Sequence, residues 1–330
     1  MTDFSNDLAQ AFIGATILTL KIQCRLDVQH AGTEIISPEK KNDAAFGIGG
    51  LVGILATDMN GSAVLGFSQP AFLKVLRGLL NDPKVEVTKE NEDAAAELLN
   101  IIFAQSRTIL GKKGQAIQMA IPSVLRGTDV GVRFTKKQQA QIIKFKVDGS
   151  DFFIKFAVSP MEKAEKSQPS QTSTPTATRN ILAMQLIEST VYIFKVQFQM
   201  EIKPGKPFEK MVHHEYPFEI AGVVGISSNS LDGSFLLVFQ QSVYIKLINK
   251  VFGEASTEFN PETDDLVAEI TNMILGATKK VLNTKGFNIQ MAIPTVIRGS
   301  DVHSSPPKDH KAIVIPFTSA LGDFSLELEL

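Results

Sequence analysis

The sequence predicts an α+β protein made of two tandem copies of one domain, each a largely antiparallel sheet flanked by helices. Three observations predict this fold class. The chain has 330 residues, the length of about two domains. Residues 112–129 recur as 284–301, with 12 identities in 18 positions. Hairpin signals dominate each copy and the helices come in pairs, which favours α+β over regularly alternating strands and helices.

The duplication is expected to extend over the whole chain. The same offset of 172 residues pairs Gly53 with Gly225 and requires no gap. Between the copies, 11 of the 21 residues of 159–179 are Ser, Thr or Pro, a composition that cannot bury a core and is typical of a linker. We therefore predict a first repeat over 1–158, a linker over 159–179 and a second repeat over 180–330.

Each repeat is expected to begin with a helix that is followed by a strand. Apolar residues around 5–18, and again around 180–190, predict the two helices. Apolar and polar residues alternate over 20–28, and likewise over 194–200. Strict alternation is typical of a strand with one buried face, so both segments are predicted as strands.

A hairpin and two helices are expected next, in the overall order α-β-β-β-α-α-β-β-β. The hairpin strands are predicted over 51–57 and 62–67, with the turn at Asn60 and Gly61, because Asn-Gly favours a tight turn. Asn260 is a suitable N-cap for the second of the paired helices in the second repeat. The remaining elements are expected as helices over 70–80, 90–112, 241–252 and 261–284, and as strands over 143–147, 152–156 and 324–330.

Composition and charge exclude several classes of function. The chain has 33 basic and 35 acidic residues, so its net charge of −2 offers no electrostatic surface for nucleic acid. Its single cysteine, Cys24, excludes a disulfide framework, and no spacing of His, Cys or carboxylates predicts a metal or cofactor site. No apolar run has the roughly 20 residues that a membrane-spanning helix needs. We expect a cytoplasmic protein without membrane insertion.

One polar pair is retained in both copies. Glu97 and Asn100 recur as Glu269 and Asn272, at the same position of the same predicted helix. Residues three apart on a helix project from one face, and the neighbours are apolar, so the pair marks an outward stripe. A solvated helix face is the plainer explanation of such a pair. A functional role is favoured because the pair is retained while the residues between it change from Leu-Leu to Ile-Thr.

These residues carry a resemblance to a known family. The segment E-I-T-N-M-I-L-G at 269–276, followed by M-A-I-P-T-V-I-R-G at 291–299, resembles the CheX/CheC family of chemotaxis phosphatases. The likeness covers most of both repeats, and the E-x-x-N helix is its most specific element. It implies two tandem CheC/CheX-like domains that dephosphorylate the phospho-aspartate of a CheY-like response regulator.

The resemblance also implies a role for each residue of the pairs. Glu97 and Glu269 would hold the docked regulator by pairing with its active-site lysine. Asn100 and Asn272 would orient the water that attacks phosphorus in line, a task that suits an amide because it donates and accepts without charge. The domain would need no cofactor or metal of its own, since the regulator is expected to bring its Mg²⁺.

The first repeat departs from the family pattern, because Ala104 stands where the second has Gly276. A methyl group there would narrow the surface that accepts the partner, so we expect the first site to be the weaker one. Related CheX proteins form homodimers, and the two repeats are therefore expected to pair within one chain. Two alternatives remain: a non-catalytic adaptor for response regulators or flagellar-switch partners, and a purely structural duplicated scaffold.

Overall fold

The computed structural model describes residues 3–36, 44–56, 58–135, 138–160, 175–210, 216–253, 255–306 and 310–330. The first repeat contains α1 (Asp3–Cys24), β1 (Val28–Ile36), β2 (Ala45–Ala56), β3 (Met59–Phe67), α2 (Gln69–Leu80), α3 (Ala94–Gly111), β4 (Ile117–Met119), β5 (Ser123–Phe134), β6 (Ala140–Val147) and β7 (Ser150–Pro160). The second contains α4 (Pro175–Phe198), β8 (Ile202–Pro204), β9 (Phe208–Glu209), β10 (Phe218–Ser227), β11 (Asp232–Phe239), α5 (Gln241–Phe252), α6 (Pro261–Thr284), β12 (Gln290–Met291), β13 (Thr295–Ser305), β14 (Ala312–Ser319) and β15 (Phe324–Glu329).

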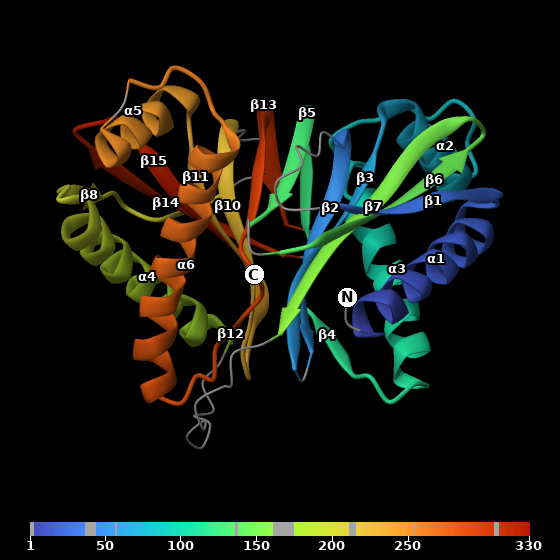
Figure 1. The fold of residues 1–330 in the computed structure, drawn as a ribbon, viewed down its shortest axis with the longest axis horizontal. Helices are drawn as coiled ribbons and strands as arrows, with labels where there is room; N and C mark the ends of the chain where they lie inside the picture. The colour runs from blue at the N-terminus through green and yellow to red at the C-terminus, as the bar shows by residue number, and fades with distance from the viewer. Residues whose placement is uncertain are drawn as a thin grey trace.

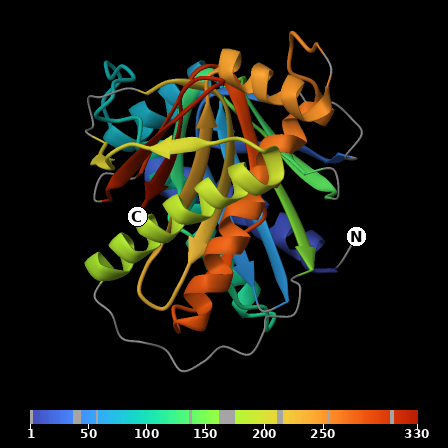
Figure 2. The same ribbon diagram turned by 90° about the vertical axis from the view of Figure 1, so that its left-hand side faces the viewer.

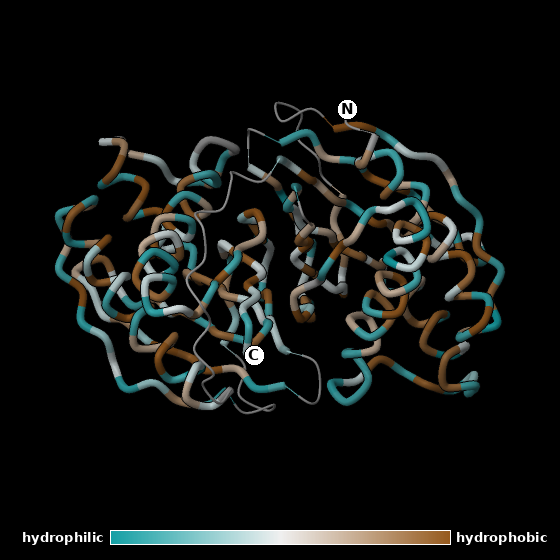
Figure 3. The backbone as a smooth tube through the Cα atoms, turned by 90° about the horizontal axis from the view of Figure 1, so that it is seen from below, coloured by the Kyte–Doolittle hydropathy of each residue, from teal (hydrophilic) through white to brown (hydrophobic). Residues whose placement is uncertain are grey.

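One antiparallel sheet runs through both repeats. Its strand order is β1-β6-β7-β3-β2-β5-β13-β10-β11-β15-β14-β8, so the two halves join where β5 pairs with β13. Figure 1 shows these two strands at the centre of the molecule, with the helices of each repeat on its outer side. Seen from below, the helices lie at the two outer ends and the strands between them (Figure 3). The predicted α+β class with a largely antiparallel sheet is confirmed.

Within the described part of the chain, three hydrophobic clusters form the core. One packs the helices of the first repeat on its strands, and a second does the same for the second repeat. Figure 2 shows α4 and α6 crossing in front of the sheet of the second repeat. Neighbouring residues of a strand alternate between clusters, as Val64 and Leu65 do, so the third cluster lies on the face away from the helices. It contains residues of both repeats, such as Val132 and Val302.

Equivalent residues of the two repeats make reciprocal contacts on this inner face. Ser62 Oγ donates to the carbonyl oxygen of Ile293 at 3.0 Å, and Ser234 Oγ donates to that of Ile121 at 3.1 Å. Both donors and both acceptors are related by the offset of 172 residues. At the centre, β2 and β10 cross so closely that a Cβ on Gly53 would lie 2.9 Å from the Cα of Gly225.

The strands predicted over 20–28 and 194–200 are wrong, because α1 extends to Cys24 and α4 to Phe198. In a strand Leu20, Ile22 and Cys24 would share one face. The structure instead buries Leu20 and Cys24 while Ile22 is 60% exposed, which is helical spacing. Leu20 and Cys24 lie on the buried face of the helix, whereas Ile22, which completes the alternation in the sequence, lies on the exposed face.

The duplication is not gapless. Backbone conformation aligns the ends of the first helices at an offset of 174, since Arg25 (φ 57°) and Gln199 (φ 50°) both adopt the left-handed conformation there. From β2 and β10 onward the offset is 172, so the second repeat is two residues shorter between its first helix and β10. Most of the predicted linker, residues 161–174, lies outside the described residues.

The turn predicted at Asn60 and Gly61 is also wrong. Both residues lie in β3, where Asn60 pairs with Leu55 and Gly61 with Ile54. Gly61 is required by close approach rather than by a turn, because a Cβ there would lie 2.2 Å from the carbonyl oxygen of Ala157 on β7. The paired helices, by contrast, lie where the sequence predicted them, within a few residues at each end.

In the described part of the chain, one helical segment, Thr176–Phe198, has the length and hydropathy of a membrane span. Leu182, Leu186 and Phe194 on its inner side are buried in the core of the second repeat. This packing is that of a core helix, which passes the same test of length and composition.

Candidate active site

Helix α6 begins at a well-formed cap. Asn260 Oδ1 accepts a hydrogen bond from Thr263 N at 3.0 Å, and Thr263 Oγ1 accepts one from Asn260 N at 2.9 Å. These reciprocal bonds satisfy two amides at the helix start, as a capping box does. The predicted N-cap is confirmed, and it places the second E-x-x-N pair in the third and fourth turns of the helix.

The second pair lies on the outer face of α6. Glu269 and Asn272 are both exposed, while Ile270 and Ile274 beside them are fully buried. Three residues turn a helix by about 300°, so the carboxylate and the amide project from one side. Neither side chain has a hydrogen bond or ion pair with another described residue. The outward stripe expected from the sequence is present, and its polar atoms are available to a partner.

The first pair occupies the corresponding place on α3. Glu97 is exposed and Asn100 is half-buried, and Leu98 and Leu99 between them are buried. Figure 1 shows α3 and α6 in opposite halves of the molecule. The structure therefore brings together the two members of each pair, but it holds the two pairs as separate sites.

The position that distinguishes the two copies lies on the same surface. Ala104 and Gly276 are both exposed, and a Cβ added to Gly276 would meet no atom within 4 Å. Packing within the chain therefore does not require glycine at 276. Apart from the different helix propensities of Ala and Gly, an effect of this difference on the site would come from contact with a partner.

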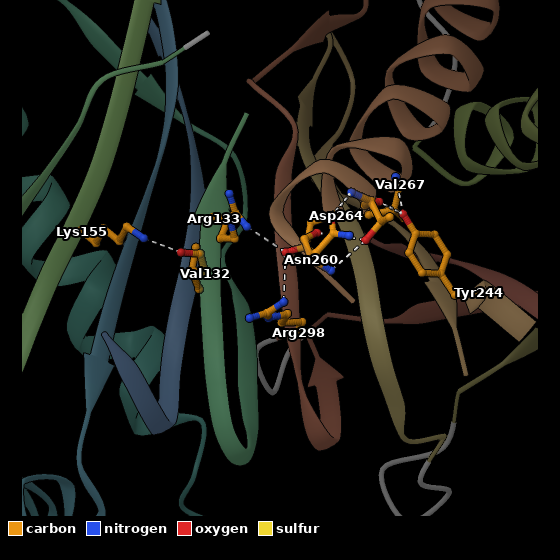
Figure 4. Close-up of polar contacts among 9 residues, drawn as sticks. Val132, Arg133, Lys155, Tyr244, Asn260, Asp264, Val267 and Arg298 are labelled. Atoms are coloured by element: carbon orange, nitrogen blue, oxygen red, sulfur yellow. Dashed lines mark hydrogen bonds and ion pairs between the residues drawn. The ribbon is translucent and has the colours of Figure 1, made fainter. Parts of the chain in front are cut away.

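A buried tyrosine supports the first turn of α6. Tyr244 on α5 donates its hydroxyl hydrogen to the carbonyl oxygen of Thr263 at 2.5 Å and accepts from the amide of Val267 at 2.9 Å. Burial raises the pKa of Tyr244 well above its usual value, so the hydroxyl keeps its hydrogen. Figure 4 shows the Tyr244 side chain with its hydroxyl end directed at Val267.

A charged cluster fixes the same turn from the other side. The carboxylate of Asp264 is fully buried, and its Oδ2 accepts from Arg133 Nη1 at 3.0 Å and from Arg298 Nη1 at 3.2 Å (Figure 4). Arg133 lies on β5 of the first repeat and Arg298 on β13 of the second. Burial raises the pKa of Asp264, and the two guanidinium groups oppose that shift. The cluster therefore joins the two repeats at the start of α6.

Sequence reasoning missed this cluster. Arg298 lies in the segment that recurs between the repeats, and Asp264 lies in the first turn after the predicted cap, but neither position by itself predicts a buried ion pair. Arg133 had no such signal, because its contact depends on how β5 pairs with β13. No characteristic interval in the sequence predicts a long-range ion pair of this kind.

A second buried cluster lies on the inner face near the end of the chain. Glu329 accepts a hydrogen bond from Ser123 Oγ of the first repeat. Glu327 Oε2 accepts from Lys210 Nζ at 2.6 Å and from Ser304 Oγ at 2.9 Å. Burial, together with the neighbouring Glu327 carboxylate, raises the pKa of Glu329 to about 7, against the opposing hydrogen bond from Ser123.

The described residues contain no group of three or more His, Cys, Asp or Glu side chains placed to hold a metal ion. The two carboxylates Glu327 and Glu329 are already engaged by a lysine and by serine hydroxyls.

Comparison with protein families decides the relationship. A family model described as chemotaxis phosphatase CheX matches residues 48–146 and 220–318, which together are more than half of the chain. The chain belongs to the CheX family. Each E-x-x-N pair lies within one of the two matched ranges, so the chain holds two CheX domains in tandem, as the sequence predicted.

Solved structures of similar proteins each match about half of this tandem CheX protein. A CheC-like superfamily protein from Shewanella sp. PV-4 is 30% identical, covering 45% of this chain and 96% of that chain, with a TM-score of 0.41. Chemotaxis protein CheX from Vibrio vulnificus is 28% identical (44% and 97% covered, TM-score 0.41). The CheX–CheY–BeF₃–Mg²⁺ complex from Borrelia burgdorferi gives 22% identity (45% and 95%, TM-score 0.36). A comparison with curated proteins finds no significant match.

Proposed function

We propose that this protein is a phosphatase that stimulates dephosphorylation of the phospho-aspartate of a CheY-like response regulator. The observation that supports this most is the E-x-x-N pair, which projects from one outer helix face in both repeats. Membership of a family described as chemotaxis phosphatase CheX also supports it. A solvated helix face does not explain why both the carboxylate and the amide recur while buried neighbours change.

The two side chains have different tasks in this proposal. The carboxylate of Glu269 pairs with a lysine of the docked regulator, and Glu97 does so in the first repeat. The amide of Asn272 or Asn100 enters beside the phosphorylated aspartate. There the amide oxygen accepts a hydrogen bond from the attacking water, and the amide N–H₂ donates a hydrogen bond to a phosphoryl oxygen. The two hydrogen bonds orient the water in line with phosphorus. Positioning of this kind supplies about 10²-fold, which corresponds to about 2.7 kcal/mol of barrier.

The reaction takes place on the partner and forms no covalent intermediate with this chain. Phosphoryl transfer from a carboxylate is assisted by a divalent cation that neutralises the phosphoryl oxygens, and the regulator brings that Mg²⁺. The chain itself contributes orientation of water and a docking charge, and we assign it no cofactor. We also propose that the protein acts in the cytoplasm, together with the regulator.

We further propose that the chain is a single-chain equivalent of a dimer. The reciprocal bonds of Ser62 and Ser234 and the crossing at Gly53 and Gly225 are what an isologous interface between identical subunits produces. The repeats over 1–158 and 180–330, joined by the linker, would then each supply one site. Because both sites face outward, two regulators could be engaged at once.

A second function is a non-catalytic adaptor that docks response regulators or flagellar-switch partners. Docking alone needs the carboxylate and the surrounding surface, not the amide. Retention of Asn100 and Asn272 in both repeats therefore favours the enzyme.

The deciding experiment measures phosphate release from a phosphorylated CheY-like receiver domain with and without the protein. The phosphatase proposal expects faster release that depends on protein concentration and disappears in the double variant Asn100→Ala, Asn272→Ala. Unchanged release together with measurable binding of the receiver would replace the enzyme with the adaptor.

A further inference from the structure

Besides Tyr244, three buried polar side chains of α6 itself hold the helix that bears the second E-x-x-N pair. They are those of Asp264, Thr271 and Thr278, which follow one another at intervals of seven residues. Seven residues are about 20° short of two full turns, so the three side chains project from the same face of the helix. Thr271 packs so closely on β10 that a Cβ on Gly222 would lie 2.1 Å from its Oγ1. Thr278 Oγ1 donates to Ser189 Oγ of α4 at 2.9 Å. The face of α6 that packs against the second repeat is thus fixed near the start, the middle and the end of the helix.

Of these contacts, the one at Asp264 reaches into the other repeat. Thr271 and Thr278 contact β10 and α4 of the second repeat, whereas Arg133 Nη1 comes from β5 of the first repeat. The side chain of Arg133 is 15% exposed and that of Arg298 is 34% exposed, so Arg133 is the more deeply buried of the two donors to Asp264. A buried carboxylate depends strongly on such a donor, because removing one partner leaves its charge poorly compensated.

We propose that Arg133 of the first repeat is a positioning residue for the E-x-x-N site of the second repeat, acting through Asp264 on the helix that holds Glu269 and Asn272. This inference rests on the proposed phosphatase function. Asp264 precedes Glu269 by five residues, which is about 7.5 Å along the axis and about 140° around it. A shift at Asp264 therefore moves the outer stripe without any direct contact between Arg133 and the regulator.

The contact from the other repeat differs between the two sides of the molecule. In the first repeat Glu92, the equivalent of Asp264, pairs with Arg126, the equivalent of Arg298, at 3.1 Å. The position equivalent to Arg133 in the second repeat is Ser305, which has no guanidinium group to offer to the first repeat. Loss of Arg133 should therefore affect the site on α6 and spare the site on α3. This difference separates positioning from a general contribution to folding, because a destabilised molecule would lose both sites together.

The test measures each site alone, by adding Arg133→Met to a variant in which only one site is intact. In the Asn100→Ala background, which leaves the second site, we expect kcat/KM for a phosphorylated receiver domain to fall about tenfold, since small displacements of a positioning group have effects of this size or larger. In the Asn272→Ala background, which leaves the first site, we expect less than a twofold change. Arg133→Lys should restore most of the loss in the first background.

Two controls keep the test decisive. Lys146→Met removes an exposed ion pair with Asp151 in the same repeat and should leave both sites unchanged. Arg133→Gln keeps an N–H donor and replaces Arg133→Met if that variant does not fold. Equal losses at both sites, no loss at either, or failure of both variants to fold while Arg133→Lys folds would each overturn the proposal.

A measurement that does not use activity separates this proposal from the phosphatase function. Hydrogen exchange of the whole protein should show faster exchange in the first turns of α6 for Arg133→Met, by tenfold or more, with α3 unchanged and Arg133→Lys close to wild type. If the parent single-site variants have no activity, the phosphatase proposal fails and hydrogen exchange alone decides the positioning role. Unchanged exchange in α6 would overturn it.

Discussion

At the scale of single residues, Glu269 and Asn272 are both exposed but have different expected effects on catalysis. Glu269→Ala removes a charge pair that acts while the complex forms, so the apparent KM for the phosphorylated regulator should rise. Asn272→Ala removes the group that orients water, so kcat should fall by about 10²-fold, or about 2.7 kcal/mol, with binding nearly intact. Steady-state kinetics in the Asn100→Ala background check both. An unchanged kcat for Asn272→Ala would contradict the catalytic role.

Glu329 gives a second prediction at this scale, concerning pH. Burial raises its pKa from 4.5 to about 7 in the folded protein, so the folded state binds its proton more tightly than the unfolded state does. The associated stability is present at low pH and is lost as pH rises through about 7, by up to about 3 kcal/mol. Glu329→Gln should remove this loss.

Urea unfolding at pH 5 and pH 8 checks the expectation for Glu329. The wild type should lose more unfolding free energy between the two values than Glu329→Gln does. Parallel losses in the two proteins would show that the carboxylate does not titrate in this range. Ser123→Ala is a useful companion, because it removes the hydrogen bond that joins Glu329 to the first repeat.

At the scale of elements, the packing of α6 on β10 is set by a glycine. A Cβ at Gly222 would lie 2.1 Å from Thr271 Oγ1 and 2.9 Å from the carbonyl oxygen of Val267, so α6 would have to move away. We expect Gly222→Ala to cost about 1–3 kcal/mol of unfolding free energy. Gly276→Ala is the matched control: its Cβ meets open space, and alanine should stabilise the helix by up to about 1 kcal/mol. Chemical denaturation of the two variants compares them, and equal stability would contradict the close contact.

The elements also show how far sequence reasoning extends. Helix α6 was predictable to the residue, because a cap, a proline at its first position and a long apolar periodicity agree over 261–284. The strand prediction over 20–28 was wrong because alternation over a few positions also occurs at the end of a helix. The structure shows the difference, since Ile22 is exposed while Leu20 and Cys24 are buried. The prediction of the hairpin turn was wrong because Gly61 is required for close contact with β7, a strand that lies far away in the sequence.

Some residues of the candidate site were identifiable from the sequence and others were not. Glu97, Asn100, Glu269 and Asn272 were identifiable because a duplicated chain shows what is retained within itself. The residues that hold the second helix in place were not, since Arg133 meets Asp264 only through pairing of β5 with β13. The exposed side chains of the site form a short motif in the sequence. The buried contacts that position them depend on how the strands pair.

At the scale of the whole molecule, the joined sheet predicts the oligomeric state. Pairing of β5 with β13 and the shared inner cluster already bury the surface that one repeat offers to the other. We expect the full-length protein to be a monomer at micromolar concentration, because a second copy would find this interface occupied. Light scattering coupled to size exclusion measures the mass. A stable dimer of full-length chains would contradict the prediction.

The last prediction concerns the balance between the two sites of one molecule. Asn272 is exposed beside Gly276, whereas Asn100 is half-buried beside the methyl group of Ala104, so the second site offers its amide more openly to a regulator. Asn272→Ala should therefore lower stimulated phosphate release more than Asn100→Ala does. The Ala/Gly difference is isolated by the exchange Ala104→Gly, which adds room on α3 without altering either pair, and which should raise first-site activity in the Asn272→Ala background. Equal losses from the two Asn variants would show that the sites are equivalent. An Ala104→Gly variant no more active than its parent would mean that the burial of Asn100, not the methyl group, limits the first site.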